Sequence, residues 1–231
     1  MVVITGASKG IGKAVAVAFA AAGKKILICS RTEANLLDTV TDIRNGYPNA
    51  EVMSFVADMS QRQQVGDFGN WCLQQGTPTV LVNNAGIYIP GSLSNEEEGN
   101  MEYTMNLNFF SAYHLTRQLL PAMKSAGKGH IFNICSIASL HAYEGGGSYS
   151  VSKYALNGFS KNLRHELKST GIKVTAVFPG AVLTDSWAGF DNSEKRILET
   201  TDISSMIVAA TQVSAQAVVE EIVIRPQLGD L

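Results

Sequence analysis

The chain has 231 residues, of which 45% are hydrophobic and 16% charged, with a formal net charge of −2. A chain of this length can fold without disulfides or a metal, and 18 basic against 20 acidic residues create no field that would gather nucleic acid or anionic lipid. The longest apolar run, Ala14–Ala22, is too short to cross a bilayer. We therefore expect a cytoplasmic protein without nucleic-acid or membrane partners. The low charged fraction favours an oligomer.

The cysteines and histidines indicate no metal site. The chain has an odd number of cysteines, Cys29, Cys72 and Cys135. They lack CxxC spacing and lie in apolar segments, which is typical of buried thiols. The four histidines form no HExxH motif or other ligand cluster, so we expect no bound metal.

Short β-branched runs alternate with longer amphipathic patterns along the chain. Strands are expected at Val2–Thr5, Lys25–Cys29, Glu51–Val56, Thr79–Val82, His130–Cys135, Lys173–Phe178 and Glu221–Arg225. Helices are expected at Ile11–Ala22, Glu33–Arg44, Gln61–Gln75, Met101–Ala126 and Tyr149–Thr170, with a kink or an irregular turn at Pro121. This order predicts an α/β fold: one domain over residues 1–231, with a doubly wound parallel sheet of about seven strands and helices on both faces. The irregular stretch 181–203 is expected to overhang a ligand crevice.

The first expected strand runs directly into a glycine-rich turn, Thr5-Gly6-Ala7-Ser8-Lys9-Gly10-Ile11-Gly12, and a helix follows. Glycines allow such a turn to approach a pyrophosphate closely, and the N-terminus of the helix offers free N–H groups to the phosphates. A strand before the turn and a helix after it strengthen this interpretation. The sequence therefore predicts a dinucleotide site formed by Gly6, Ser8, Lys9, Gly10, Ile11 and Gly12.

The turn and four later motifs, in this order, resemble the short-chain dehydrogenase/reductase family. These motifs are Asn83-Asn84-Ala85-Gly86 after the fourth strand, Asn108 in the central helix, Ser136 with Tyr149-x-x-x-Lys153, and Pro179-Gly180 with Thr184. The resemblance runs from Val2 to at least Thr184. It implies a Rossmann fold, hydride transfer, and cofactor contacts from Asp58, Met59, Asn84, Ala85, Gly86, Pro179, Gly180, Val182 and Thr184. For Asp58, capping of the helix expected to start near Gln61 is an alternative.

The end of the second strand favours NADP(H) over NAD(H). NAD-binding sites usually place an acidic residue there, whereas this chain has Ser30-Arg31-Thr32. A guanidinium matches the charge and geometry of a 2′-phosphate. Lys9 in the glycine turn offers a second positive charge, so Lys9, Arg31 and Thr32 are predicted cofactor contacts.

Tyr149 and Lys153 are four residues apart and share one face of the expected helix. Because a free tyrosine has a pKa near 10, we expect the neighbouring ammonium to lower that pKa and make Tyr149 a usable acid or base. Ser136 would hydrogen-bond the substrate oxygen. The resemblance implies that Lys153 also binds the nicotinamide ribose and that Asn108 helps hold a relay water. Asn106 is a competing assignment for Asn108.

The substrate is expected to be a small carbonyl compound bound by apolar and aromatic groups. The candidate contacts are Ala138, Tyr143, Trp187 and Asp230. The tail, Val218–Leu231, resembles the ending of bacterial sepiapterin reductases, in which case Asp230 would pair with the amino-pyrimidinone edge of a pterin. The alternatives are a solvated tail with a generic ketone or 3-oxoacyl substrate, and a non-catalytic NADP(H)-sensing protein.

The resemblance also implies a homodimer or homotetramer. Family members pair the two long helices, here Met101–Ala126 and Tyr149–Thr170, across a two-fold axis. Apolar residues on more than one face fit such pairing, although they can instead all face the sheet of their own subunit: Ala112, Leu115, Leu119, Ala155, Leu156, Phe159 and Leu163.

Overall fold

A computed structural model describes residues 1–187 and 189–230. Seven parallel strands form one sheet in the order β3-β2-β1-β4-β5-β6-β7. Their bounds are β1 (Val2–Thr5), β2 (Ile26–Ser30), β3 (Val52–Val56), β4 (Val80–Asn83), β5 (Gly129–Ile134), β6 (Ile172–Pro179) and β7 (Glu221–Ile224). Every predicted strand boundary lies within one residue of the observed one, and the doubly wound parallel sheet is confirmed.

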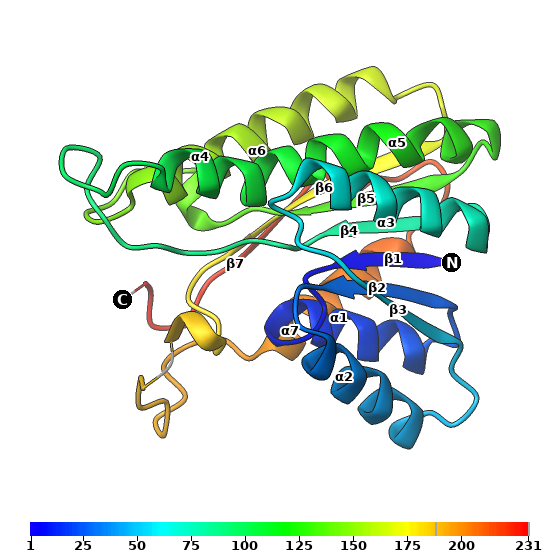
Figure 1. Ribbon diagram of the computed structural model, residues 1–231, viewed down its shortest axis with the longest axis horizontal. Helices are drawn as coiled ribbons and strands as arrows, with labels where there is room; N and C mark the ends of the chain where they lie inside the picture. Colours follow the sequence, from blue (N-terminus) through cyan, green and yellow to red (C-terminus); the bar gives the residue numbers. More distant parts are fainter. Residues whose placement is uncertain (188, 231) are drawn as a thin grey trace.

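Helices cover both faces of the sheet (Figure 1). One face carries α1 (Gly10–Ala21), α2 (Glu33–Gly46) and α7 (Thr200–Thr211). The other carries α3 (Arg62–Gln75), α5 (Ser111–Ser125) and α6 (Gly147–Glu166), with the short α4 (Asn100–Met105) packed against α6. None of the helices in the described residues is long and apolar enough to cross a membrane.

Strand residues alternate between two cores because successive side chains point to opposite faces of a sheet. Val3 and Leu27 pack beneath α3 and α5, whereas Ile4 and Ile28, one residue further along, pack beneath α1, α2 and α7. All four are fully buried. Burial on both faces explains why β1 and β2 have apolar residues at nearly every position.

The long predicted helix over residues 101–126 is not regular. A five-residue π-helix, Asn106–Phe110, separates α4 from α5, and α5 continues through Pro121 to Ser125. The irregular turn thus lies at Asn106–Phe110 and not at Pro121. A π-helix widens the turn locally and often occurs at functional sites.

Helix α7 was not predicted. Its buried residues Ile203, Ile207 and Ala210 recur at helical spacing and pack against α1. The irregular stretch therefore ends at Glu199, the residue before α7, rather than at residue 203. It contains one 3-10 turn, Asp185–Trp187, and it hangs from the carboxyl end of β6 (Figure 1).

Because all strands are parallel, their carboxyl ends share one edge of the sheet. The chain runs outward from β1 to β2 and β3 on one side, and it then crosses back from β3 to β4 on the other side of β1. Open α/β sheets bind ligands outside such a switch point. The glycine turn, Asn84–Gly86 and Ser136 all follow strands at this edge.

Candidate active site

The turn between β1 and α1 requires glycine. Gly6 has a φ of +64°, and a Cβ added there would lie 2.8 Å from the Cα of Ala85. A Cβ on Gly12 would lie only 2.4 Å from the carbonyl oxygen of Gly6. The backbones of the first helix, the turn and the segment after β4 are thus in direct contact, as a phosphate-binding turn requires.

Thr5 and Asn84 hold this turn in place. The Asn84 side-chain amide donates to the carbonyls of Thr5 and Gly6, each at 3.0 Å, and the Thr5 hydroxyl accepts the backbone N–H groups of Asn84 and Ala85 at 3.0 and 2.9 Å. Asn84 therefore braces the turn through its side chain, and its contact with the cofactor stays a prediction.

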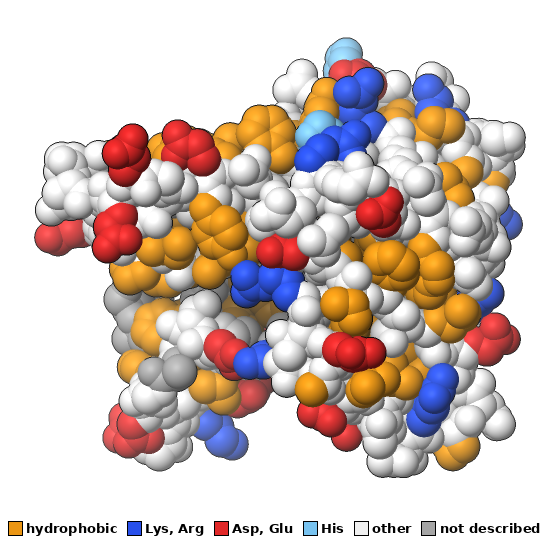
Figure 2. All heavy atoms as spheres, in the orientation of Figure 1, with side chains coloured by type: hydrophobic (Ala, Val, Ile, Leu, Met, Phe, Trp, Pro, Cys, Tyr) orange, Lys and Arg blue, Asp and Glu red, His pale blue; other side chains and the backbone are white. Residues whose placement is uncertain are grey.

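A cleft of about 440 Å³ runs beside the turn across the switch point. The face in Figure 2 is hollowed there, with basic and acidic side chains next to one another. Half of the residues that line the cleft were predicted: Gly6, Ser8, Lys9, Arg31, Thr32, Met59, Ala85 and Gly86. The other half were missed: Ser30, Asn35, Ala57, Ile87, Tyr88, Leu107, Asp185 and Ser186. Ile87 and Tyr88 directly follow the Asn-Asn-Ala-Gly motif, which is a signal that could have found them.

The remaining predicted cofactor residues are not among the described residues that line the cleft. Ile11 packs against the core, Thr184 lies against Gly10, where an added Cβ would be 3.1 Å from its Cγ2, and Val182 forms a bridge with Leu198. Pro179 ends β6 and Gly180 follows it.

Both predicted phosphate-binding cations already have partners. Lys9 Nζ lies 2.7 Å from Asp185 Oδ2, and Arg31 Nη1 donates to the hydroxyl of Tyr103 at 2.8 Å. The Lys9 pair is exposed on both sides, so it contributes little to stability and a phosphate can displace it.

Asp58 caps a turn, but not the start of α3. Its Oδ1 accepts from the backbone N–H and the hydroxyl of Ser60, at 2.9 and 2.8 Å, whereas Gln61 is the N-cap residue of α3 and has no side-chain cap. The alternative of a helix N-cap is therefore wrong, and the second carboxylate oxygen makes no hydrogen bond within the described part of the chain.

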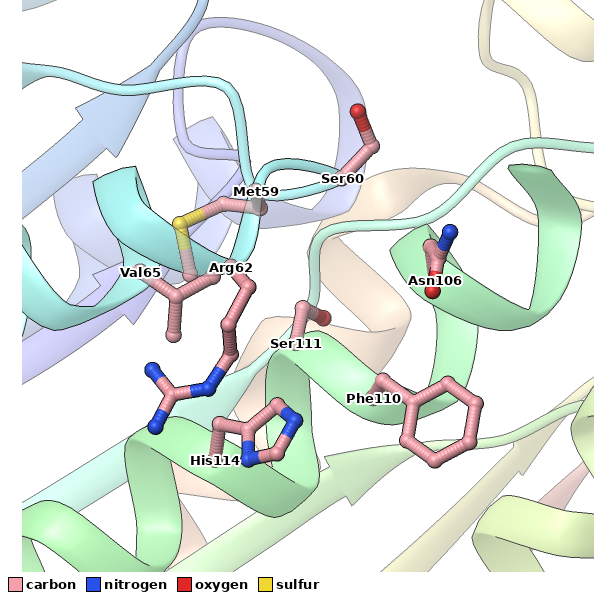
Figure 3. Close-up of a pocket in the computed structure, with 8 residues that line it drawn as sticks. All are labelled: Met59, Ser60, Arg62, Val65, Asn106, Phe110, Ser111 and His114. Atoms are coloured by element: carbon pink, nitrogen blue, oxygen red, sulfur yellow. The ribbon is translucent and has the colours of Figure 1, made fainter. Parts of the chain in front are cut away.

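Met59 separates the cleft from a second pocket of about 250 Å³, because it lines both. In Figure 3, Arg62 and His114 lie side by side in this pocket, and Asn106 and Phe110 come from the π-helix. Burial and the neighbouring Arg62 charge lower the pKa of His114. The pocket thus lies behind the π-helix, outside the predicted site.

Ser136 follows β5 and is fixed by a reciprocal cap. Its Oγ accepts the Ala138 N–H at 3.1 Å, while its own N–H donates to Ser139 Oγ at 3.2 Å. Since this Oγ accepts from the backbone, its O–H remains available to donate. Ala138 itself is buried and also accepts the Ser150 hydroxyl through its carbonyl.

Tyr149 and Lys153 share one face of α6, but their electrostatics differ from the prediction. Burial raises the pKa of Tyr149, with the Ser136 hydroxyl acting in the opposite direction. Lys153 Nζ donates to the carbonyl of Ile134 at 2.8 Å and lies 5.7 Å from the centroid of the Tyr149 ring, and the effect of burial on the Tyr149 pKa outweighs that of its charge. Burial lowers the pKa of Lys153 to about 8. The phenol therefore carries its proton at neutral pH.

The π-helix directs the Asn108 side chain toward the residues around Tyr149 and Lys153. Asn108 exchanges two hydrogen bonds with the backbone of Ile87, at 2.8 and 3.0 Å, and donates to Ser152 Oγ at 2.9 Å. A Cβ on Gly86 would lie 3.2 Å from Asn108 Oδ1 and 3.4 Å from Lys153 Nζ. Gly86, which lines the cleft, is thereby in contact with the residues around Tyr149. Asn106, the competing assignment, lies in the second pocket.

Three tyrosines gather beside the cleft. The Tyr88 ring meets the Tyr149 ring edge-on, with centroids 5.0 Å apart, and burial together with Tyr88 raises the pKa of Tyr143. Trp187 and Phe190 pack against each other at 5.2 Å. Within the described residues, neither of these two lines the cleft.

The tail after β7 folds back toward the end of β6 (Figure 1). A Cβ on Gly180 would lie 3.3 Å from Asp230 Oδ1, and Asp230 forms an ion pair with Arg225. Arg196, in the irregular stretch, donates to the carbonyls of Gly229 and Asp230 at 2.8 and 3.1 Å. Asp230 thus lies against Gly180 after β6, held by long-range contacts, and it does not line the cleft in the described part of the chain.

The cysteines are buried free thiols, and burial raises the pKa of both Cys29 and Cys135 to about 12. In residues 1–187 and 189–230, no three His, Cys, Asp or Glu side chains gather as a metal site would need.

Comparison with known proteins identifies the family. Residues 1–195 match the model of the short chain dehydrogenase family, and the chain belongs to this family. Over its full length it is 33% identical to the sepiapterin reductase of Chlorobaculum tepidum, of which the match covers 98%. It is 28% identical to an uncharacterized oxidoreductase of Staphylococcus saprophyticus, with 97% of this chain and 96% of that protein covered.

Solved structures show the same fold. A metagenomic short-chain oxidoreductase in complex with NADP matches with a TM-score of 0.86 and 28% identity, over 98% of this chain and 97% of that one. A variant of the actinorhodin polyketide ketoreductase with NADPH matches with a TM-score of 0.90 and 25% identity, over 100% of this chain and 97% of that one.

Proposed function

We propose that the chain is an NADPH-dependent carbonyl reductase that acts on sepiapterin or a related pterin dicarbonyl. The observation that carries the reaction class is the grouping of Ser136, Tyr149 and Lys153 around the carboxyl end of β5, in contact with the cleft through Gly86. A positioned acid beside a dinucleotide cleft is what carbonyl reduction needs.

The cleft fits an NADP(H) molecule. The glycine turn leads into the N-terminus of α1, which suits the pyrophosphate, and Lys9 and Arg31 line the cleft with positive charge for a 2′-phosphate. The similar metagenomic oxidoreductase was solved with NADP. When bound, the cofactor supplies the hydride that reaches the carbonyl carbon.

The chain itself supplies the proton and the orientation. Ser136 would donate its free O–H to the carbonyl oxygen, which holds the substrate beside Tyr149. As negative charge develops on that oxygen, Tyr149 would donate its phenolic proton to it, so that the carbonyl becomes an alcohol. The raised pKa keeps this proton in place at neutral pH. Lys153 would hold the ribose and supply positive charge below its pKa of about 8.

The pterin assignment is supported by Asp230 and by the similar sepiapterin reductase. A carboxylate can accept two hydrogen bonds from an amino-pyrimidinone edge, and Asp230 lies against Gly180 at the end of β6. Its ion pair with Arg225 would open as the pterin binds. The rings of Tyr88 and Tyr143 offer flat apolar surfaces for a planar substrate.

The test is NADPH oxidation, followed at 340 nm with sepiapterin, an aromatic ketone and a 3-oxoacyl thioester. We expect sepiapterin to have the highest kcat/KM, and Tyr149→Phe to lose about 10³-fold in kcat while NADPH binding stays unchanged. Preference for the ketone or the thioester would overturn the pterin assignment alone. Binding of NADPH without turnover of any carbonyl would favour an NADP(H)-sensing protein, and substantial turnover by Tyr149→Phe would remove its role as proton donor.

We also infer a homodimer or homotetramer. Of the apolar residues considered for helix pairing, Leu115, Leu119 and Leu156 are fully buried within the subunit. On α6, however, Val151 and Tyr154 are 39% and 44% exposed, which leaves an apolar face for a second copy. Light scattering would measure the mass in solution.

A further inference from the structure

One hydrogen bond spans the mouth of the cleft between its two halves. Arg31 follows β2 on one side of the switch point, and Tyr103 lies on α4, which follows β4 on the other side. Arg31 Nη1 donates to the Tyr103 hydroxyl at 2.8 Å, and 72 residues separate the two in the chain. The cleft lining includes residues from both sides of this bond, among them Arg31, Met59 and Leu107.

The two partners differ in how firmly they are held. Tyr103 is partly buried, and its ring packs against the core beneath α3 and α5. Arg31 is exposed, and an exposed arginine loses rotamer entropy when a ligand fixes it. The Tyr103 hydroxyl therefore serves as a fixed point that holds a side chain which would otherwise move freely.

This geometry leaves Arg31 able to bind an anion. A guanidinium has five N–H donors, and Tyr103 takes one of them, on Nη1. The donors on the remaining edge suffice for a bidentate contact with a phosphate. Since the Tyr103 oxygen accepts from Arg31, its own O–H is free to donate to a phosphate oxygen. The Tyr103 hydroxyl brings no negative charge to Arg31, whereas the Asp185 carboxylate offsets the positive charge of Lys9.

We propose that Tyr103 is a positioning residue that preorganises Arg31 for the 2′-phosphate of NADP(H) and so contributes to the choice of NADP(H) over NAD(H). This proposal rests on the proposed function, because it takes the dinucleotide in the cleft to be NADP(H). Preorganisation increases affinity by removing an ordering cost from the binding step. The effect should be confined to ligands that carry the 2′-phosphate.

The probes are adenosine 2′,5′-bisphosphate and adenosine 5′-monophosphate, with binding measured by calorimetry, which requires no turnover. Tyr103→Phe keeps the ring in the core and removes only the hydroxyl. We expect it to weaken the bisphosphate roughly three- to ten-fold and to leave the monophosphate within about two-fold. The matched control is Tyr113→Phe, which removes the hydroxyl that Arg117 Nη1 contacts at 2.9 Å on α5, and should change neither affinity.

Arg31→Ala in single and double variants shows whether Tyr103 acts through Arg31. In the Arg31→Ala background, Tyr103→Phe should cause no further loss of bisphosphate affinity. An equal loss for both nucleotides, or a full additional loss in that background, would overturn the positioning role. Wild-type protein that bound both nucleotides equally would overturn the NADP(H) assignment together with this proposal. If the wild type preferred the bisphosphate and only the predicted effect of Tyr103→Phe were absent, this proposal would fail and the NADP(H) assignment would stand.

Discussion

The two sides of the cleft are built differently. On the cofactor side, the backbone is tightly packed: a Cβ on Gly12 would be 2.4 Å from the Gly6 carbonyl oxygen and 2.5 Å from the side-chain amide nitrogen of Asn84. On the proposed substrate side, the irregular stretch and the tail are joined by side chains at the surface, with Arg196 on two tail carbonyls and Arg225 paired with Asp230.

This difference separates two tasks. The cofactor stays the same whichever carbonyl compound is the substrate. A rigid backbone turn can therefore bind it with little loss of conformational entropy. Pairs between partly exposed charges contribute little stability and exchange readily. If the proposed function holds, we therefore expect substitutions on the proposed substrate side to change which carbonyl compound binds without disturbing the cofactor side.

Gly12→Ala tests the rigidity of the cofactor side and should have the largest effect on stability. The added methyl group has no room, so we expect a loss of about 2–4 kcal/mol in the free energy of unfolding and at least roughly ten-fold weaker NADPH binding. Urea denaturation and fluorescence titration measure the two quantities. Gly46→Ala is the matched control: nothing lies within 4 Å of its added Cβ, so the helix should gain about 0.5–1 kcal/mol. A Gly12→Ala protein with wild-type stability would contradict the backbone contact.

Lys153→Met tests how much the buried amine of Lys153 lowers the free energy of unfolding. Its pKa in the folded protein is about 8 against 10.5 for the free side chain, so the folded state binds fewer protons than the unfolded state between these values, and stability rises with pH there. The penalty is complete below about pH 8. We expect Lys153→Met to raise the free energy of unfolding by about 2–3 kcal/mol at pH 7, offset in part by the lost bond to Ile134.

The gain from Lys153→Met should shrink as the pH rises above 8 and vanish beyond the pKa of a free lysine. Thermal unfolding of both proteins between pH 6 and 10 measures this trend. A difference in stability that did not change with pH would show that Lys153 is not strained by burial.

Asp230→Asn tests the surface side-chain pairs of the irregular stretch and the tail, and it should have the smallest effect of these variants. We expect kcat/KM for sepiapterin to fall roughly five- to twenty-fold, because a charge-assisted contact becomes a neutral one. Turnover of a simple ketone and the unfolding temperature should stay the same. Glu194→Gln, which changes an exposed acid in the irregular stretch, is the matched control. Unchanged sepiapterin kinetics in Asp230→Asn would eliminate the pterin contact.

Local patterns predicted the sheet and much of the cleft lining, because buried parallel strands are apolar on both faces and the glycine turn follows directly from β1. The signal for α7 was present in Ile203, Ile207 and Ala210, but it follows an irregular stretch that hides its start. The π-helix has no such signal, and Pro121 drew the expected irregularity to the wrong place.

Contacts between distant parts of the chain were the hardest to predict. Lys9 meets Asp185 across 176 residues, and Arg31 meets Tyr103 across 72. Likewise, the bond from Lys153 to the Ile134 carbonyl depends on the packing of α6 against β5. Spacing along a helix indicates that two groups share a face, not where each hydrogen bond goes.

The buried cysteines make this protein convenient for site-directed labelling. With a pKa of about 12, Cys29 and Cys135 hold about one thiolate per 100,000 molecules at pH 7, and burial raises the pKa of Cys72 as well. Alkylating dyes react with thiolates, so the native cysteines would stay silent. A single Ser193→Cys variant would then accept one fluorophore on the irregular stretch, where it could report in real time on substrate capture while the wild-type chain serves as the unlabelled blank.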